Sequence, residues 1–327
     1  MRPLLALLAT TLLCAAPSAA ASPYLPPAGK VFAGVAGGRD LSDFEARTGA
    51  RPAVWQHWVQ WGDGVGYALR RSAAAHARAM LHLSTAPAQN ARGRISPGAI
   101  ARGEGDAYLV RLNRALADYG APVYLRLFAE MNNCDLAYSS YDCSGRRRDA
   151  DHSPRRFKQA WRRIVTILRG GRVRLRTGDA DLPRPQVAFL WSPMTGGSPN
   201  IPALRPGVYW PGSRFVDWVS TSFYSKFPTF HYLEPYYRDF AQRFHKPFAF
   251  GEWAMWGADD AGFARRLFAW IRGHGRVRMA VYNQGQNPVG PFRLRHFPRA
   301  QRVIRAALGS SLFAKAATST SGANHTT

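Results

Sequence analysis

The chain has 327 residues, with 44 Lys and Arg against 20 Asp and Glu, which gives a formal net charge of +24 at pH 7. Hydrophobic residues make up 46% of the sequence and aromatic residues 13%, so the composition excludes a disordered polycation, which would be poor in aromatic residues. The length fits one large domain or two small ones.

The first residues have the pattern of a secretory signal peptide. A basic Arg2 precedes the apolar run over residues 4–16, and small residues follow up to Ala21. The run is too short to span a bilayer as a helix, so we predict that residues 1–21 are cleaved off after export. No later stretch resembles a transmembrane span. We therefore expect a secreted, extracellular protein.

Eight short apolar runs have the length and composition of buried strands. They span residues 31–35, 53–58, 79–83, 123–128, 187–191, 218–223, 248–250 and 279–282. Amphipathic stretches between them predict helices at residues 107–119, 156–168, 235–244, 263–271 and 299–308. Strands that alternate with helices form a parallel sheet, and eight of them close a barrel. The sequence therefore predicts an α/β fold, a single (β/α)8 TIM barrel.

No shift in composition and no Ser/Gly linker divides the chain, so we predict one catalytic domain over residues 22–312. Residues 313–327 are rich in Ser, Thr, Ala and Gly and are expected to form a disordered tail. We expect the protein to be a monomer. In barrels of this kind chemistry takes place at the carboxyl ends of the strands, where the following loops meet.

Two cysteines, Cys134 and Cys143, remain in the predicted mature chain, within a loop rich in Tyr, Ser and Asp. In an exported protein such a pair favours one local disulfide, and two free thiols are the alternative. Two cysteines alone do not form a zinc site, and no His-Glu-x-x-His motif is present. We expect neither a metal nor another cofactor.

The positive charge comes almost entirely from arginine, because the chain has only five lysines. The arginines are spread over predicted helices and loops, which is more typical of a solvated surface than of a nucleic-acid stripe, and we expect no nucleic-acid partner. A basic exterior still raises the encounter rate with anionic polymers. A weak attraction to anionic cell-wall polymers is therefore a secondary hypothesis.

The chain has only five glutamates, and two of them follow predicted strands. Glu45, Glu104 and Glu234 lie in or near the starts of helical stretches, where a carboxylate has an ordinary structural role. Glu130 and Glu252 come after the fourth and seventh strands, whose ends can face each other across a barrel mouth. Two carboxylates so placed are what cleavage of a glycosidic bond requires, and separate ion pairs with Arg are the alternative.

Aromatic and polar residues near the same strand ends also indicate a glycan site. Sugars present apolar C–H faces that stack on rings such as those of Trp58 and Trp253, whereas their hydroxyl groups need polar partners. The polar candidates are Gln56, His57, Asn132, Asn283 and Gln284. For His57 and His82 the alternative interpretation is that they are structural histidines, hydrogen-bonded within the fold.

Several motifs in a fixed order resemble those of glycoside hydrolase family 26. They are Arg-Leu-Phe-Ala-Glu-Met-Asn (126–132), Leu-Trp-Ser-Pro (190–193), Tyr-Trp-Pro-Gly (209–212), Phe-Val-Asp-Trp-Val (215–219), Tyr224, and Lys246-Pro247 before Gly-Glu-Trp (251–253). That family contains chiefly endo-β-1,4-mannanases with (β/α)8 barrels. The match extends over most of residues 31–308.

The resemblance implies a role for each matching residue. Glu130 would be the general acid/base and Glu252 the nucleophile, which Tyr224 would orient. Arg126 would lie beneath the carboxylates and keep the nucleophile charged, and Trp191 would form part of the sugar platform. The sequence departs from the family in two places, since Ala129 replaces the usual His before the acid/base and Met194 replaces the usual Asn after Trp-Ser-Pro.

The sequence thus predicts a secreted retaining endo-glycosidase that acts on a β-linked polysaccharide, with β-1,4-mannan as the first choice and mixed-linkage glucan or xylan next. A retaining enzyme needs carboxyl groups about 5 to 5.5 Å apart. The competing prediction is a barrel that binds glycans without cutting them, and the replacement of the usual His by Ala129 favours it.

Overall fold

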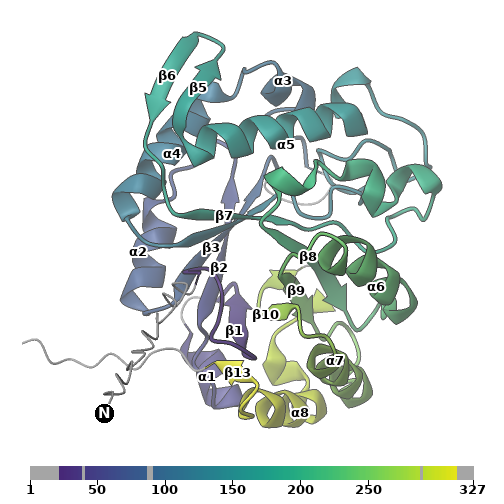
Figure 1. Ribbon diagram of the computed structural model, residues 1–327. Helices are drawn as coiled ribbons and strands as arrows, with labels where there is room; N and C mark the ends of the chain where they lie inside the picture. Colours follow the sequence, from purple (N-terminus) through teal and green to yellow (C-terminus); the bar gives the residue numbers. More distant parts are fainter. Residues whose placement is uncertain (1–21, 39–40, 87–90, 288–289, 315–327) are drawn as a thin grey trace, which may run out of the picture.

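In the computed structural model, residues 22–38, 41–86, 91–287 and 290–314 are described, and eight parallel strands among them form a closed barrel (Figure 1). These strands are β1 (Val31–Ala36), β2 (Val54–Gln60), β3 (Arg78–Ser84), β4 (Val123–Leu127), β7 (Val187–Trp191), β8 (Trp218–Tyr224), β9 (Phe248–Ala254) and β10 (Val277–Asn283). Each pairs with the next, and β10 pairs with β1. The predicted (β/α)8 TIM barrel is confirmed, and every predicted strand overlaps an observed one.

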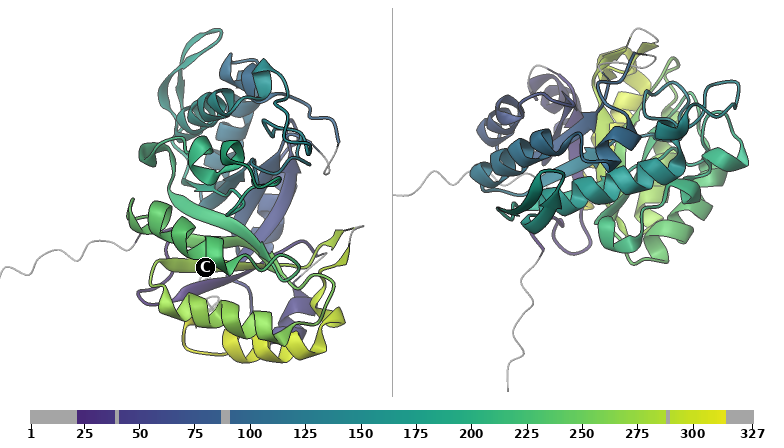
Figure 2. Two further views of the ribbon diagram at one scale, coloured as in Figure 1. Left: turned by 90° about the vertical axis from the view of Figure 1, so that its right-hand side faces the viewer. Right: turned by 90° about the horizontal axis from the view of Figure 1, so that it is seen from above.

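Helices cover the outside of the barrel (Figure 2). They are α1 (Ser42–Thr48), α2 (Gly66–Ala74), α3 (Pro97–Ala101), α4 (Asp106–Tyr119), α5 (Pro154–Arg169), α6 (Phe230–Tyr236), α7 (Ala261–Gly273) and α8 (Pro298–Leu308). The helix predicted at residues 235–244 is divided between the end of α6 and a π-helical segment, Tyr237–Gln242. Pro235 lies inside α6 and has no backbone N–H to donate, so the regular hydrogen-bond pattern is interrupted here.

Short 3-10 helices lie in the loops, at Ala150–His152, Pro202–Leu204, Pro206–Tyr209, Ser213–Phe215 and Leu294–His296. Two antiparallel hairpins were not predicted. One is β5 (Gly171–Leu175) with β6 (Gly178–Leu182), which projects at the upper left of Figure 1, and the other is β11 (Gln286–Asn287) with β12 (Gly290–Pro291). The first hairpin carries Arg172 and Arg174, which pair with Asp179. Its mostly polar sequence has no apolar run that would predict a strand.

The fold extends slightly past the predicted domain end. Strand β13 (Phe313–Ala314) pairs in parallel with β1, so these two residues belong to the barrel sheet and not to the predicted tail. The predicted signal peptide, residues 1–21, and the rest of the predicted tail, residues 315–327, lie outside the described residues. Within the described ranges, no helix is both long and apolar enough to cross a membrane.

The interior of the barrel is apolar at one end and polar at the other. A buried apolar cluster fills the barrel and is separate from the larger core under the helices. It includes Phe32, Val54, Met80, Tyr124, Leu190, Trp218, Ala249 and Met279. Side chains two residues apart share a face of a strand. His82 and Arg126 therefore point into the barrel, as Met80 and Tyr124 do, and lie nearer to the carboxyl ends of the strands. Buried polar side chains thus gather toward the carboxyl ends of the strands, and this end holds the candidate site.

Candidate active site

Glu252 lies within β9, where a β-bulge turns its side chain into the barrel. The pairing of β8 with β9 skips Gly251, which is the extra residue of the bulge. On a regular strand Phe250 and Glu252 would share a face. Here Phe250 packs against Trp270 of α7, with ring centroids 5.5 Å apart, whereas Glu252 is 5% exposed and faces inward. The carboxylate therefore belongs to the strand itself, and not to the residues just past it.

Four side chains hold the Glu252 carboxylate. Gln56 Nε2 donates to Oε1 at 2.7 Å, and Trp58 Nε1 donates to the same oxygen at 3.1 Å. The Tyr224 hydroxyl donates to Oε2 at 3.3 Å, and Arg126 Nη1 lies 3.1 Å from Oε2. Both oxygens are thus fixed in direction.

These contacts keep Glu252 ionised. Burial raises the pKa of its carboxyl, but the charge of Arg126, the nearby His82 and the hydrogen bond from Gln56 lower the pKa from 4.5 to about 2. Burial also lowers the pKa of His82, and Arg126 lowers it further. Arg126 Nη1 donates a hydrogen bond to His82 Nδ1 at 3.2 Å, and the same nitrogen lies 3.8 Å from Glu252 Oε1. The site therefore holds one fixed anion beside one fixed cation.

Arg126 is fully buried and makes contacts in three directions. Its Nε donates to Ser192 Oγ at 3.1 Å and its Nη2 to Ser222 Oγ at 2.6 Å, in addition to the contacts of Nη1. A Cβ at position 251 would lie 2.8 Å from Arg126 Nε, so the residue before Glu252 is glycine for a packing reason. Gly251 thus leaves space for the Arg126 side chain beside the Glu252 carboxylate.

Glu130 follows β4 on a tight turn. Phe128 and Glu130 have φ values of 43° and 57°, a left-handed conformation that costs non-glycine residues about 1 to 2 kcal/mol each. The turn is held because Glu130 N–H donates to the Ser192 carbonyl at 2.7 Å and the Tyr138 hydroxyl donates to the Ala129 carbonyl at 2.6 Å. The Glu130 side chain is half-buried, and Asn133 Nδ2 donates to its Oε2 at 3.2 Å.

The two carboxylates act on the same neighbours. Burial raises the pKa of Tyr224 well above 10.0, and the negative charges of Glu252 and Glu130 raise it further. The charges of both carboxylates also act on the imidazole of His82. Glu130 and Glu252, 122 residues apart in the sequence, therefore share one electrostatic environment at the carboxyl ends of the strands.

Trp58 gives this site an exposed aromatic surface. Its indole N–H is bound to Glu252, yet 43% of the residue remains exposed. The ring lies against Gly37 and Gly285, where an added Cβ would come within 3.0 Å of ring atoms. Two glycines therefore leave space for a flat ring beside the carboxylate.

His57 is not in the site, which corrects the expectation of a sugar contact. It lies on the opposite face of β2 from Gln56 and Trp58, and its Nε2 forms a hydrogen bond with Ser72 Oγ of α2 at 2.9 Å. Burial and the charge of Arg71 lower the pKa of His57 to about 4. It is therefore a structural histidine between strand and helix, the alternative given above.

Trp191 and Trp253 are core residues, so the structure also corrects their expected sugar contacts. Trp191 is fully buried, and its ring centroid lies 4.7 Å from that of Trp210 and 4.8 Å from that of Phe240. Trp253 follows the bulge and points outward, with its centroid 5.4 Å from that of Phe268 in α7. Neither ring has a face free for a ligand.

Asn132 is buried and holds a loop by hydrogen bonds. Its Nδ2 donates to the carbonyls of Met194 and Leu204 at 2.9 and 3.0 Å, and Met194 N–H donates to its Oδ1 at 2.8 Å. The amide is buried and fully used, so the predicted role in sugar binding is corrected to a structural one.

Several residues of the site were missed or given another role. The sequence offers His82 as a structural histidine and Gln56 and Asn283 as candidate sugar partners, and no sequence signal points to Ser192 or Ser222. Asn283 Nδ2 donates to the Tyr224 hydroxyl at 3.0 Å. The alternation of inward and outward residues along 54–58 and 80–82 would have separated Gln56 from His57 and placed His82 beside Arg126.

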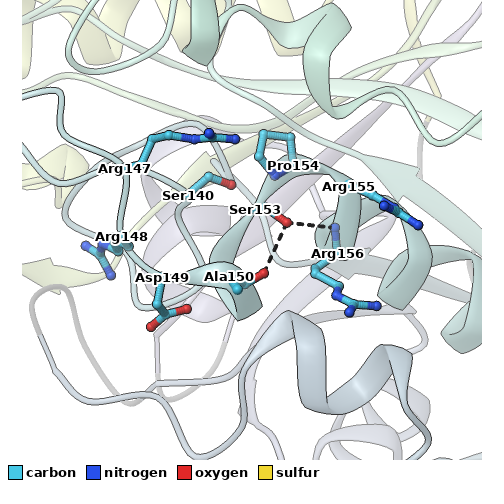
Figure 3. Close-up of a pocket in the computed structure, with 9 residues that line it drawn as sticks. All are labelled: Ser140, Arg147, Arg148, Asp149, Ala150, Ser153, Pro154, Arg155 and Arg156. Atoms are coloured by element: carbon cyan, nitrogen blue, oxygen red, sulfur yellow. Dashed lines mark hydrogen bonds between the residues drawn. The ribbon is translucent and has the colours of Figure 1, made fainter.

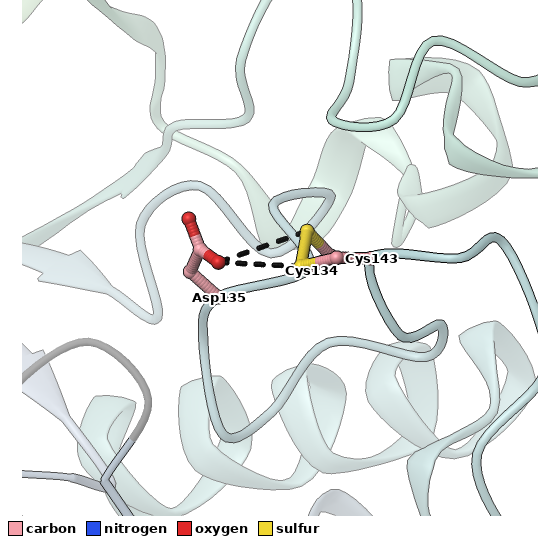
Figure 4. Close-up of side chains that lie close together, drawn as sticks. All are labelled: Cys134, Asp135 and Cys143. Carbon is pink, nitrogen blue, oxygen red and sulfur yellow. Dashed lines mark hydrogen bonds between the residues drawn. A yellow bond between two sulfur atoms is a disulfide. The ribbon is translucent and has the colours of Figure 1, made fainter.

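The structure has the predicted disulfide between Cys134 and Cys143, in the loop that follows Glu130 (Figure 4). Asp135 Oδ1 lies 3.2 Å from Cys143 Sγ and 3.8 Å from Cys134 Sγ. Within the described part of the chain, this is the one cluster of three residues of metal-binding type. Because both sulfurs are in the disulfide, neither is a thiolate, and the cluster offers a metal only one carboxylate.

Comparisons with known proteins rest on structure, since no family model and no curated protein sequence matches the chain. An endo-β-1,4-mannanase from Cellulomonas fimi aligns with a TM-score of 0.62 at 14% identity, over 88% of this chain and 73% of that one. A Bacillus subtilis mannanase aligns with a TM-score of 0.59 at 15% identity, over 89% and 88%. A family 26 β-mannanase from Bacteroides ovatus aligns with a TM-score of 0.58 at 13% identity, over 88% of this chain and 91% of that one. The chain therefore has the barrel fold of glycoside hydrolase family 26 mannanases, which confirms the resemblance of its motifs at the level of the fold.

Proposed function

We propose that this protein is an exported, retaining glycoside hydrolase that cuts β-1,4-mannan within the polymer. Glu252 would be the nucleophile and Glu130 the general acid/base. The observation that carries the proposal is the environment of Glu252, which is buried, hydrogen-bonded by Gln56, Trp58 and Tyr224, and kept ionised beside Arg126.

The reaction would proceed in two displacements. In the first, Glu252 attacks the anomeric carbon, the bond from that carbon to the leaving oxygen breaks, and Glu130 gives its proton to that oxygen. In the second, Glu130 takes a proton from water, the water oxygen bonds to the anomeric carbon, and the ester to Glu252 breaks. The first step needs an ionised Glu252, and the low pKa supplies it.

The choice of mannan is supported by two features. The solved structures that share the fold include endo-β-1,4-mannanases. Trp58, exposed beside Glu252, offers the ring on which a pyranose could stack. Mixed-linkage glucan and xylan remain alternatives on the same scaffold, since the loops around the mouth select the sugar.

Release of reducing ends from soluble galactomannan tests the proposal. Wild type should hydrolyse the polymer, and Glu252→Ala should be inactive. Proton NMR of the first product should show a retained anomeric configuration. Azide should restore turnover of an activated aryl glycoside by Glu252→Ala with inverted configuration, because the small anion takes the place of the nucleophile. Parallel assays on glucan and xylan identify the substrate.

The competing function is a barrel that binds glycans without cutting them. The departure that favours it is Ala129, a small buried residue whose carbonyl is bound by Tyr138. Affinity for mannan without release of reducing ends, in wild type and in Glu252→Ala alike, would establish this second function. An inverted product from wild type would reject Glu252 as the nucleophile.

A further inference from the structure

Asn133 is a buried polar residue that lies behind the Glu130 carboxylate, and it is 6% exposed. Its N–H donates to the Glu130 carbonyl at 2.8 Å, which closes a turn, and its Nδ2 donates to Glu130 Oε2 at 3.2 Å. Ala129, the residue before Glu130, has no polar side-chain atom. In the part of the chain that the structure describes, Asn133 is thus the residue that supplies the hydrogen bond to the Glu130 carboxylate.

A second contact fixes the orientation of the Asn133 amide. Asp135 N–H donates to Asn133 Oδ1 at 3.2 Å. A backbone N–H can only donate, so the atom that it meets must be the amide oxygen, and the amide nitrogen must be the atom that faces Glu130. The side chain therefore presents a donor to the carboxylate and not an acceptor.

The backbone around Asn133 is held on both sides. Ser198 N–H donates to the Asn132 carbonyl at 2.9 Å, and Cys134 N–H donates to the Ser198 carbonyl at 2.9 Å. Arg148, which lines the pocket at the start of α5 in Figure 3, donates from Nη2 to the Cys134 carbonyl at 2.6 Å. The amide is therefore fixed by backbone pairing, and it does not depend on Glu130 for its position.

The hydrogen bond from Asn133 assigns the proton of the acid to one oxygen. An Oε2 that accepts an N–H cannot carry a proton in the same direction, so a protonated Glu130 holds its proton on Oε1. When that proton moves to the leaving oxygen, negative charge returns to the carboxylate, and a hydrogen bond to a charged acceptor is stronger than one to a neutral acceptor. Such a donor stabilises the transition state more than the ground state.

We propose that Asn133 is a positioning residue for the general acid/base. It holds Glu130 Oε2, leaves the proton on Oε1 for the glycosidic oxygen, and stabilises the carboxylate that forms as the bond from the anomeric carbon to that oxygen breaks. Because Asn133 is buried, it acts through Glu130 and needs no contact with the polymer. The inference rests on the proposed function and deepens it, with the same substrate.

The test compares kcat/KM of full-length protein on two substrates. The leaving alcohol of galactomannan must take a proton, whereas the phenolate of an activated dinitrophenyl β-mannobioside leaves without one. Asn133→Ala should lower kcat/KM on galactomannan by about tenfold, because the forming carboxylate loses a hydrogen bond. On the activated substrate the same variant should lose less than about twofold. A loss of fold alone would affect both substrates equally.

Asn133→Asp separates the structure of the turn from the chemistry. Its carboxylate still accepts from Asp135 N–H, so the turn keeps that contact, but the donor to Glu130 is replaced by a negative charge. This charge opposes ionisation of Glu130. The variant should lose more than Asn133→Ala on galactomannan, and the alkaline limb of its profile of kcat/KM against pH should move to higher pH by about one unit.

A matched control removes an amide elsewhere. Asn200 is exposed and donates to the Tyr232 hydroxyl, so Asn200→Ala should change kcat/KM less than about twofold on both substrates. Thermal unfolding of each variant checks the fold. Equal losses on the two substrates in Asn133→Ala, or an alkaline limb that does not move in Asn133→Asp, would overturn the inference and leave Asn133 as a residue of the turn.

Failure of this inference is distinguishable from failure of the proposed function. Hydrolysis of galactomannan by wild type, together with equal losses in the variants, overturns the role of Asn133 alone. Absence of hydrolysis by wild type on both substrates overturns the proposed function, and the role of Asn133 with it.

Discussion

Arg126 Nη1 lies 3.1 Å from Glu252 Oε2, and the two side chains are 0% and 7% exposed. The contact joins the fourth and seventh barrel strands across the interior. Burial of two charges is costly, and the cost is offset only where hydrogen bonds satisfy the remaining polar atoms, as Ser192, Ser222 and Gln56 do here. The charge of the proposed nucleophile and the stability of the barrel therefore depend on the same pair.

Replacement of Arg126 by Met should destabilise the protein by about 3 to 5 kcal/mol, because Glu252 is left as a buried charge without a partner. Urea unfolding at pH 7 measures this. The double variant R126M/E252Q should recover much of the loss, since the unpaired charge is gone. Equal destabilisation of the single and double variants would mean that the two side chains are not coupled.

The low pKa of Glu252 also predicts how stability depends on pH. Because the folded pKa of about 2 lies below the ordinary value of 4.5, the ionised carboxylate stabilises the fold above pH 4.5, and this contribution is lost as the pH falls toward 2. The shift corresponds to about 3 kcal/mol. Urea unfolding between pH 6 and pH 3 should show a steeper loss in wild type than in Glu252→Gln. Parallel curves for the two proteins would contradict the assignment.

His57 and Trp58 are neighbours on β2 that face opposite sides, so their variants should behave differently. Trp58→Ala removes a donor to Glu252 and the exposed ring, and should lower kcat/KM on mannan by about 100-fold. Trp58→Phe keeps a ring but removes the indole N–H, and it should lower kcat/KM on mannan by about tenfold. His57→Gln should change kcat/KM less than about twofold, because its partner is Ser72 of α2. Similar losses in all three variants would show that β2 acts only through the fold.

The disulfide should stabilise the loop after Glu130 without taking part in chemistry. Cys134 and Cys143 enclose a short loop, and cross-linking a loop of this length restricts the unfolded chain by about 2 to 3 kcal/mol. C134S/C143S should lower the melting temperature and raise KM while kcat stays measurable. Identical melting temperature and KM in the variant and in wild type would leave the bridge without a role.

Asn132 should matter for stability through the loop that it holds. Asn132→Ala removes the hydrogen bonds to Met194 and Leu204 and leaves buried backbone groups without partners, at a cost of about 2 to 4 kcal/mol. Asn200→Ala is the control in the loop that Asn132 holds, since Asn200 is exposed and its side chain donates to the Tyr232 hydroxyl at 2.7 Å; it should cost less than about 0.5 kcal/mol. Chemical denaturation compares the two, and equal effects would contradict the special role of Asn132.

The sequence by itself predicted the barrel and the disulfide, and it singled out Glu130 and Glu252 as the two glutamates that follow apolar runs. Apolar runs that alternate with amphipathic stretches are local patterns, and the backbone geometry of strands and helices translates them directly into elements. With only five glutamates in the chain, the two that follow apolar runs, Glu130 and Glu252, could be separated from the others by position alone.

Only the tertiary structure decided which side chains meet. Trp58 lies within β2 and Trp191 ends β7, yet the first is exposed beside Glu252 and the second is enclosed by Trp210 and Phe240. The bulge at Gly251 turns Glu252 inward, and no local pattern shows it. Whether a side chain faces the barrel interior or the helices depends on strand register and on partners far away in the sequence, so these assignments required the packed barrel.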